Sequence, residues 1–175
     1  MTKQSRERSA SAKLAVFPRQ RETVTMNVSG PVFVMHWHAR PKLEDVRRVL
    51  DDARDARLAY GKPMLHLVMV SNDALSMPGA DVRTEMTLHM KEMDENFDGH
   101  VLVLGALGFV AAALHALAST LALAGSRRPG RTRICRGVDE GVRACVELAA
   151  PRSIDESALR DTLLGLEGLG PGALR

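Results

Sequence analysis

Histidines are the residues of this chain that most readily suggest chemistry, because several lie in stretches with strand character. His36 and His38 form an H-x-H pair on one face of an expected strand, and His66 and His100 lie in or beside two others. An H-x-H pair can ligate zinc or iron, and Cys135 could join it. No further ligand stands at a diagnostic spacing. We therefore interpret these side chains as partly buried strand histidines and predict no metal and no cofactor.

Signatures of catalysis are weak along the rest of the chain. Gly105-x-x-Gly108 precedes an expected helix and could offer backbone amides to an anion, but close packing of strand and helix explains the glycines equally well. His115 stands among apolar helix residues, which is typical of a core position. No serine lies in a G-x-S-x-G motif, and no Cys–His or paired-acid motif suggests a hydrolase. We predict a protein that has no catalytic residues and is not an enzyme.

The charge of the chain is concentrated near its first residue. The 175 residues carry a net charge of +3, but residues 1–21 hold six basic side chains and one acidic one, so the remainder is close to neutral. Residues 1–21 lack the apolar core of a secretory signal, and we interpret them as a disordered basic tail, although transit peptides share this composition. Aromatic residues make up only 3%, too few for base stacking, so we expect no nucleic-acid binding by the folded domain. Cys135 and Cys145 form no recurring framework, which is typical of reduced thiols in a cytoplasmic protein.

Hydrophobic periodicity predicts the elements that would position these residues. Strands are expected within 23–30 and 31–39, joined as a hairpin, and within 64–70, 100–106 and 131–136. Helices are expected from Pro41, from Asp81, over 109–124, from Asp139 and from Ser153. On the first helix the spacing predicts an inward face of Leu43, Val46, Leu50, Ala53 and Ala56 and an outward face of Glu44, Asp45, Arg47, Arg48 and Asp52.

The helix starts carry their own signals. Asp81 is a plausible N-cap for the second helix, whose inward stripe would be Val82, Met86, Met90, Met93 and Phe97. The stretch 153–156 has the form of a capping box, with Ile154, Ala158, Leu163 and Leu166 facing inward after it. Together the elements predict an α/β fold: a mixed sheet of about five strands, four helices and an extra C-terminal helix. We place the domain at 22–150 and the added helix with its flexible end at 151–175.

The stretch 101–124 contains no charged residue and is long enough to cross a membrane. Its character changes, however, at Gly105–Gly108, where alternating Val and Leu give way to Ala-rich helix formers. We therefore predict a buried strand over 101–104 and a helix over 109–124 that is too apolar to remain uncovered, with a single membrane span as the less favoured alternative.

This order of elements, from Thr23 to Leu148, resembles the STAS domain of anti-sigma-factor antagonists. The hairpin "TVTMNVSGPVFVMHW", the strand "MLHLVMV" and the closing "RICRGVDEGVRACVEL" carry the resemblance. The phosphorylated serine loop of the family, which follows its third strand, is not matched. That place holds Ser71, Asn72 and Asp73 and then Ser76, before Asp81.

The resemblance implies a non-enzymatic regulatory module in bacterial signalling, which binds a regulatory protein partner through the loop Ser71–Asp81 and the helix that follows it. It leaves open whether Ser71 or Ser76 is phosphorylated, and it does not imply an oligomeric state. The alternative is a small-ligand or lipid-binding domain, since lipid-transfer proteins have a similar fold, with the apolar helix 109–124 lining the site.

Overall fold

The computed structural model describes residues 17–60, 64–75, 79–104, 130–150 and 153–168. Six strands form one sheet: β1 (Arg19–Gln20), β2 (Val24–Ser29), β3 (Val32–Trp37), β4 (Leu65–Val70), β5 (Gly99–Leu104) and β6 (Thr132–Cys135). The α-helices are α2 (Leu43–Tyr60), α3 (Ala80–Asn96), α5 (Val138–Ala149) and α6 (Glu156–Gly168), and a 3₁₀ helix, η1 (Asn72–Leu75), follows β4. The predicted α/β fold with a mixed sheet is confirmed, and the four described α-helices include the expected C-terminal helix as α6. The sheet has six strands where about five were expected, because β1 lies in the stretch that we interpreted as a tail.

The strands lie in the sheet in their order along the chain, from β1 at one edge to β6 at the other. β1, β2 and β3 are antiparallel neighbours, whereas β3, β4, β5 and β6 run parallel. The predicted hairpin is therefore confirmed, with Gly30 at a φ of +54°, a conformation that favours glycine in a tight turn. The predicted strand over 101–104 is also confirmed, as part of β5 between β4 and β6.

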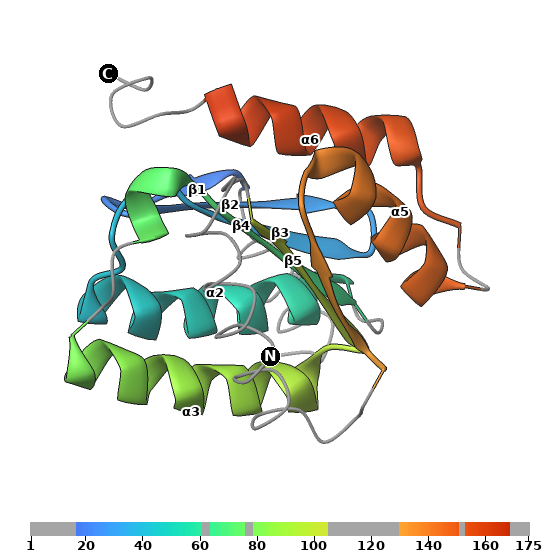
Figure 1. The fold of residues 1–175 in the computed structure, drawn as a ribbon. Helices are drawn as coiled ribbons and strands as arrows, with labels where there is room; N and C mark the ends of the chain where they lie inside the picture. The colour runs from blue at the N-terminus through green and yellow to red at the C-terminus, as the bar shows by residue number, and fades with distance from the viewer. Residues whose placement is uncertain (1–16, 61–63, 76–78, 105–129, 151–152, 169–175) are drawn as a thin grey trace, which may run out of the picture.

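Helices cover both faces of the sheet, α2 and α3 on one side and α5 and α6 on the other (Figure 1). Side chains alternate along β4, so Leu65, Leu67 and Met69 pack with α5 and α6 while Val68 and Val70 pack toward α2. Close approach of α5 requires Gly141, since a Cβ there would stand 2.6 Å from Val103 Cγ2.

Two carboxylates that we expected on the outer face of α2 are buried instead. The hydroxyl of Thr23 donates to Asp45 Oδ2 at 2.5 Å, and Arg21 and Arg19 both bind Asp52. The expectation was wrong because each carboxylate has a partner far back in the sequence, which helical spacing does not reveal. Since Arg19 belongs to β1, the folded part begins before residue 22, where we had placed its boundary.

Two helix starts also differ from the prediction. Gly79 takes the N-cap position of α3, so Asp81 lies inside the first turn, where its carboxylate still interacts favourably with the positive end of the helix dipole. For α6, Asp155 is the capping residue: its Oδ1 accepts from the amide of Ala158 at 3.0 Å. This later start leaves Ala158 exposed and places Leu159 with Leu163 and Leu166 in the core.

The prediction for the inward stripe of α3 is confirmed in part. Val82, Met93 and Phe97 are buried, while Met86 and Met90 are half-buried. The predicted helix over 109–124, with Gly105, Gly108 and His115, lies outside the described residues. No helix in the described part of the chain is long and apolar enough to cross a membrane, and residues 101–104 of the alternative span are strand.

Candidate functional site

The predicted partner loop begins at the carboxyl end of β4. The amide of Ser71 donates to the carbonyl of Trp37 at 2.9 Å, which extends the β3–β4 pairing by one bond, and the amide of Ala74 donates to the carbonyl of Ser71 at 3.1 Å. These bonds fix the loop to the two central strands. Asn72 and Asp73 then face solvent. The start of the loop is thus an exposed polar turn on a rigid base.

The five candidate residues of this loop have different environments. Asn72, Asp73 and Asp81 are exposed, and Asp81 lies in the first turn of α3. The hydroxyl oxygen of Ser71 is buried and has no hydrogen-bond partner among the described residues. A kinase could not reach that oxygen without opening the loop. Ser76 lies outside the described residues.

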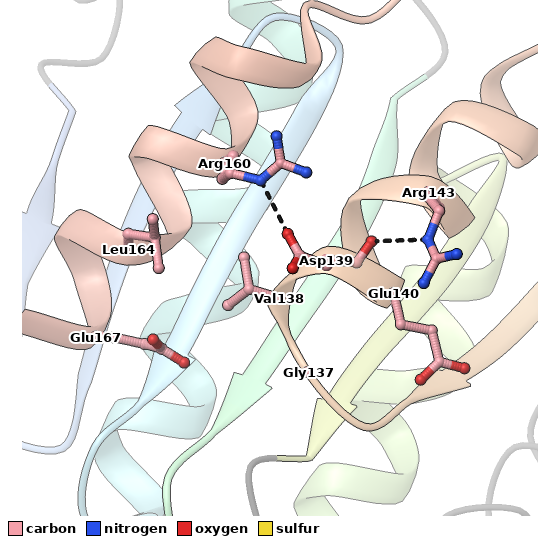
Figure 2. A pocket seen from close by; sticks show the side chains of 8 residues that line it. All are labelled: Gly137, Val138, Asp139, Glu140, Arg143, Arg160, Leu164 and Glu167. Atoms are coloured by element: carbon pink, nitrogen blue, oxygen red, sulfur yellow. Dashed lines mark hydrogen bonds and ion pairs between the residues drawn. The ribbon is translucent and has the colours of Figure 1, made fainter.

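A shallow open groove lies between the start of α5 and the outer side of α6 (Figure 2). Its walls combine two arginines, three acids and two apolar side chains, on Gly137, Val138, Asp139, Glu140, Arg143, Arg160, Leu164 and Glu167. Arg160 Nε donates to Asp139 Oδ1 at 2.9 Å, and Arg143 Nε donates to the carbonyl of Asp139 at 3.4 Å. Because acids and arginines lie together here and Arg160 pairs with Asp139, the groove carries little net charge that could select a ligand by its sign. Sequence reasoning missed it, since it forms only when α6 packs beside α5.

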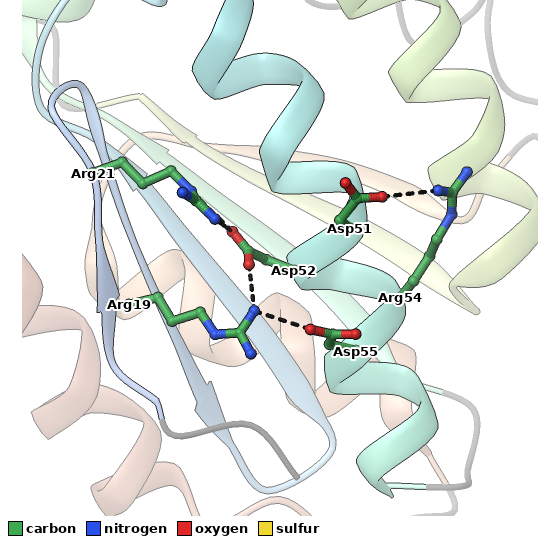
Figure 3. A network of polar contacts seen from close by, with 6 residues as sticks. All are labelled: Arg19, Arg21, Asp51, Asp52, Arg54 and Asp55. Carbon is green, nitrogen blue, oxygen red and sulfur yellow. Dashed lines mark hydrogen bonds and ion pairs between the residues drawn. The ribbon is translucent and has the colours of Figure 1, made fainter. Parts of the chain in front are cut away.

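A buried ion-pair network joins β1 to α2 (Figure 3). Asp52 is 2% exposed and accepts from Arg21 Nε at 3.0 Å and from Arg19, which also reaches Asp55 at 3.1 Å. Asp51 pairs instead with Arg54 on the outer side of α2. Both partners of Asp52 come from the segment that precedes the hairpin. The network therefore holds the N-terminal edge strand against the helix, which is a structural role.

Three histidines meet on the α3 side of the sheet. His66 and His100 are register partners on β4 and β5, and their Nδ1 atoms lie 3.3 Å apart. His89 of α3 faces His66 with ring centroids 6.5 Å apart, and Phe33 and Phe97 pack against His66 at 6.0 and 5.4 Å. All three imidazoles are buried, with exposed fractions of 0% for His66, 5% for His89 and 4% for His100. We call His66, His89 and His100 the histidine cluster.

Burial controls the ionisation of the histidine cluster. It lowers the pKa of His66 well below its ordinary value, and the neighbouring His100 and His89 lower it further. Burial also lowers the pKa of His89 to about 4. Burial lowers the pKa of His100 as well. Asp94 acts in the opposite direction, because its Oδ1 lies 3.6 Å from His100 Nε2 and favours the charged imidazole. The cluster is therefore neutral at pH 7.

Each neutral imidazole carries one ring proton, and one arrangement places a proton toward both polar neighbours of His100. With its proton on Nε2 toward Asp94, His100 presents the lone pair of Nδ1, and His66 Nδ1–H can donate to it. In the described part of the chain, His66 Nε2, His100 Nε2 and both ring nitrogens of His89 lack a partner in hydrogen-bond geometry, although Asp94 lies near His100 and the backbone of Val46 on α2 favours the charged form of His89. Sequence reasoning missed His89, although its position between Val82, Met86 and Met93 places it on the inward stripe of α3.

The H-x-H pair lies on the opposite side of the sheet. His36 and His38 are both buried, more fully than we expected, and their ring centroids are 6.1 Å apart. His36 Nδ1–H donates to the carbonyl of Leu166 at 2.9 Å, so this ring holds the end of α6. Burial lowers the pKa of both imidazoles. Cys135 is buried on β6, and no three metal-ligating side chains within the described ranges come together as a metal site.

Comparison of the chain with protein-family models, with curated proteins and with solved structures gave no match.

Proposed function

We propose that this chain is a non-enzymatic regulatory module that binds a protein partner through η1 and the first turn of α3. The observation that carries the proposal is the exposure of Asn72, Asp73 and Asp81 around a loop fixed to the central strands. Functional contacts in α/β domains concentrate on such loops, because the scaffold positions them while their side chains stay accessible. The resemblance to STAS domains assigns partner binding to the same place.

The chemistry of this surface suggests what the partner presents. Asp73 and Asp81 are exposed carboxylates, and Asn72 adds an amide that can donate and accept. Carboxylates pair best with arginine and lysine side chains. We therefore expect a partner with basic residues opposite Asp73 and Asp81, and an association that weakens as salt rises.

The experiment is cross-linking of the full chain in its native host, followed by purification of the captured protein and titration calorimetry. The double variant Asp73→Lys, Asp81→Lys should bind about tenfold or more weakly, because each reversed charge removes a charge-assisted contact. Asp161→Lys is the matched control, since it reverses an exposed charge on α6, on the other side of the sheet. Equal binding by wild type and the double variant, or the absence of any captured protein, would contradict the proposal. Circular dichroism establishes that each variant is folded.

A further inference from the structure

We propose that the histidine cluster makes α3 acid-labile: neutral imidazoles hold α3 against the sheet, and proton uptake by the cluster detaches α3 while α5 and α6 stay in place. This inference rests on packing within the domain and does not depend on the proposed partner.

The contact between His66 and His100 requires a single proton between the two facing nitrogens. With 3.3 Å between their Nδ1 atoms, one nitrogen must donate and the other must accept. A further proton on the accepting nitrogen makes that ring positively charged, removes the hydrogen bond and sets two N–H groups against each other. The rings cannot separate within the sheet, because β4 and β5 are paired at this register.

Little negative charge faces the cluster from the elements packed around it. On α3, Asp94 lies near His100. On α2, the buried carboxylates of Asp45 and Asp52 are already bound by Thr23 and by two arginines. Two aromatic rings also lie against His66, those of Phe33 on β3 and of Phe97, the residue that follows α3. Among the described residues, Asp94 is thus the carboxylate that acts on the charge of these three histidines.

The packing of α3 depends on these groups more than that of any other described helix. The buried side chains of α3 are Val82, His89, Met93 and Asp94, so half of them are ionisable. Val82 and Met93 share the apolar core with α2, and the polar links of α3 to α2 are exposed ion pairs and a hydrogen bond, from Arg47 to Glu85, Arg54 to Glu92 and Arg57 to Asn96. Such surface pairs add little. On the opposite face, α6 is held by Leu159, Leu163 and Leu166, which do not titrate, and by one hydrogen bond from His36 to the carbonyl of Leu166.

The direction of the pH effect follows from the lowered pKa values. Once α3 detaches, His89 on α3 and His66 and His100 on the sheet regain ordinary pKa values near 6.5. The state with α3 detached therefore binds protons that the state with α3 packed on the sheet, which we call the closed state, excludes. Lower pH therefore favours detachment. The effect begins as pH falls below about 6.5 and, for His89, continues until its closed-state pKa of about 4.

Hydrogen exchange measured by mass spectrometry on the full chain tests this, from about pH 7.5 to about pH 4.5, with intrinsic rates corrected at each pH. For each proton that opening takes up, protection of α3 amides should fall about tenfold per pH unit. Amides of α5 should keep their protection over the same range. Equal and simultaneous loss of protection in α3 and α5 would show global unfolding and overturn the proposal.

Two variants and one direct measurement distinguish protonation of the histidine cluster from a general loss of stability in acid. His89→Leu removes one titrating group, so protection of α3 should fall less steeply with pH. His36→Gln is the matched control, a buried histidine on the other face of the sheet, and should leave the α3 profile unchanged. An unchanged slope in His89→Leu contradicts the proposal. If that variant does not fold, NMR titration of wild-type imidazoles decides: ordinary pKa values near 6.5 for all three rings would overturn it.

Discussion

On the α5–α6 side of the sheet the described core is made of Val, Leu, Ala, Met and Cys side chains, with His36 bonded to a backbone carbonyl. On the α2–α3 side the apolar core shares its space with three histidines and the carboxylates of Asp45, Asp52 and Asp94. Both sides contain buried histidines, but they are placed differently. On the α5–α6 side His36 donates to a backbone carbonyl and His38 lies beside it, whereas on the second side His66 and His100 share one hydrogen bond and His89 of α3 faces them. One sheet therefore carries a face whose helix α6 is held mainly by leucines and a face whose helix α3 is held in half by ionisable side chains, and we expect the second to respond more strongly to pH.

The largest effect that we expect on the apolar side comes from α6. Leu163→Ala should lower the free energy of unfolding by about 2–5 kcal/mol, since Leu163 is fully buried between α6 and the sheet. Denaturant titration at neutral and mildly acidic pH measures the loss, which should be equal at both. The neighbouring Leu164 is 50% exposed, so Leu164→Ala should change the stability by no more than about 0.5 kcal/mol. A clearly larger loss in acid would mean that the two faces are coupled.

On the α2 side, Asp52→Asn should lower the free energy of unfolding by about 1–3 kcal/mol. The change leaves Arg19 and Arg21 without their buried carboxylate, but the arginines are themselves partly exposed, which limits the loss. Urea titration measures it. Asp51→Asn is the matched control one residue away, where the carboxylate is 74% exposed and the expected loss is below about 0.5 kcal/mol. Equal losses in the two variants would remove the distinction between buried and exposed carboxylates on this helix.

The smallest effect should come from the outer contact between α2 and α3. Glu92→Gln weakens the exposed pair with Arg54, and we expect a loss of no more than about 0.5 kcal/mol that shrinks further at high salt. Thermal unfolding at low and high salt measures it. A large, salt-independent loss would show that the surface pairs, and not the buried side chains, hold α3 in place.

Much of the fold could be predicted from local patterns. The turn at Gly30, the apolar run of β4 and the amphipathic spacing of α5 and α6 each depend on residues close in sequence. The burial of Asp52 could not be predicted, because its partners precede it by more than thirty residues and belonged to a stretch whose composition resembles a tail.

The candidate site was predicted less completely. The exposed positions of Asn72 and Asp73 follow from a polar stretch between a strand and a helix. The histidine cluster requires two facts that the sequence does not contain: that β4 and β5 pair with His66 opposite His100, and that α3 lies over that pair. Each histidine alone has the pattern of an ordinary core residue, and only the register brings the three together.

The sequential order of strands has a consequence for how the domain is made. Each strand from β2 to β6 pairs with the strand synthesised just before it, so the sheet can be extended as the chain leaves the ribosome. The last helix does not follow this rule, because α6 returns to lie over β2 and β3, among the first strands made. The leucines of α6 thus cover an apolar surface that stays open until α6 itself has been made, and we expect a chaperone to bind that nascent surface up to that point.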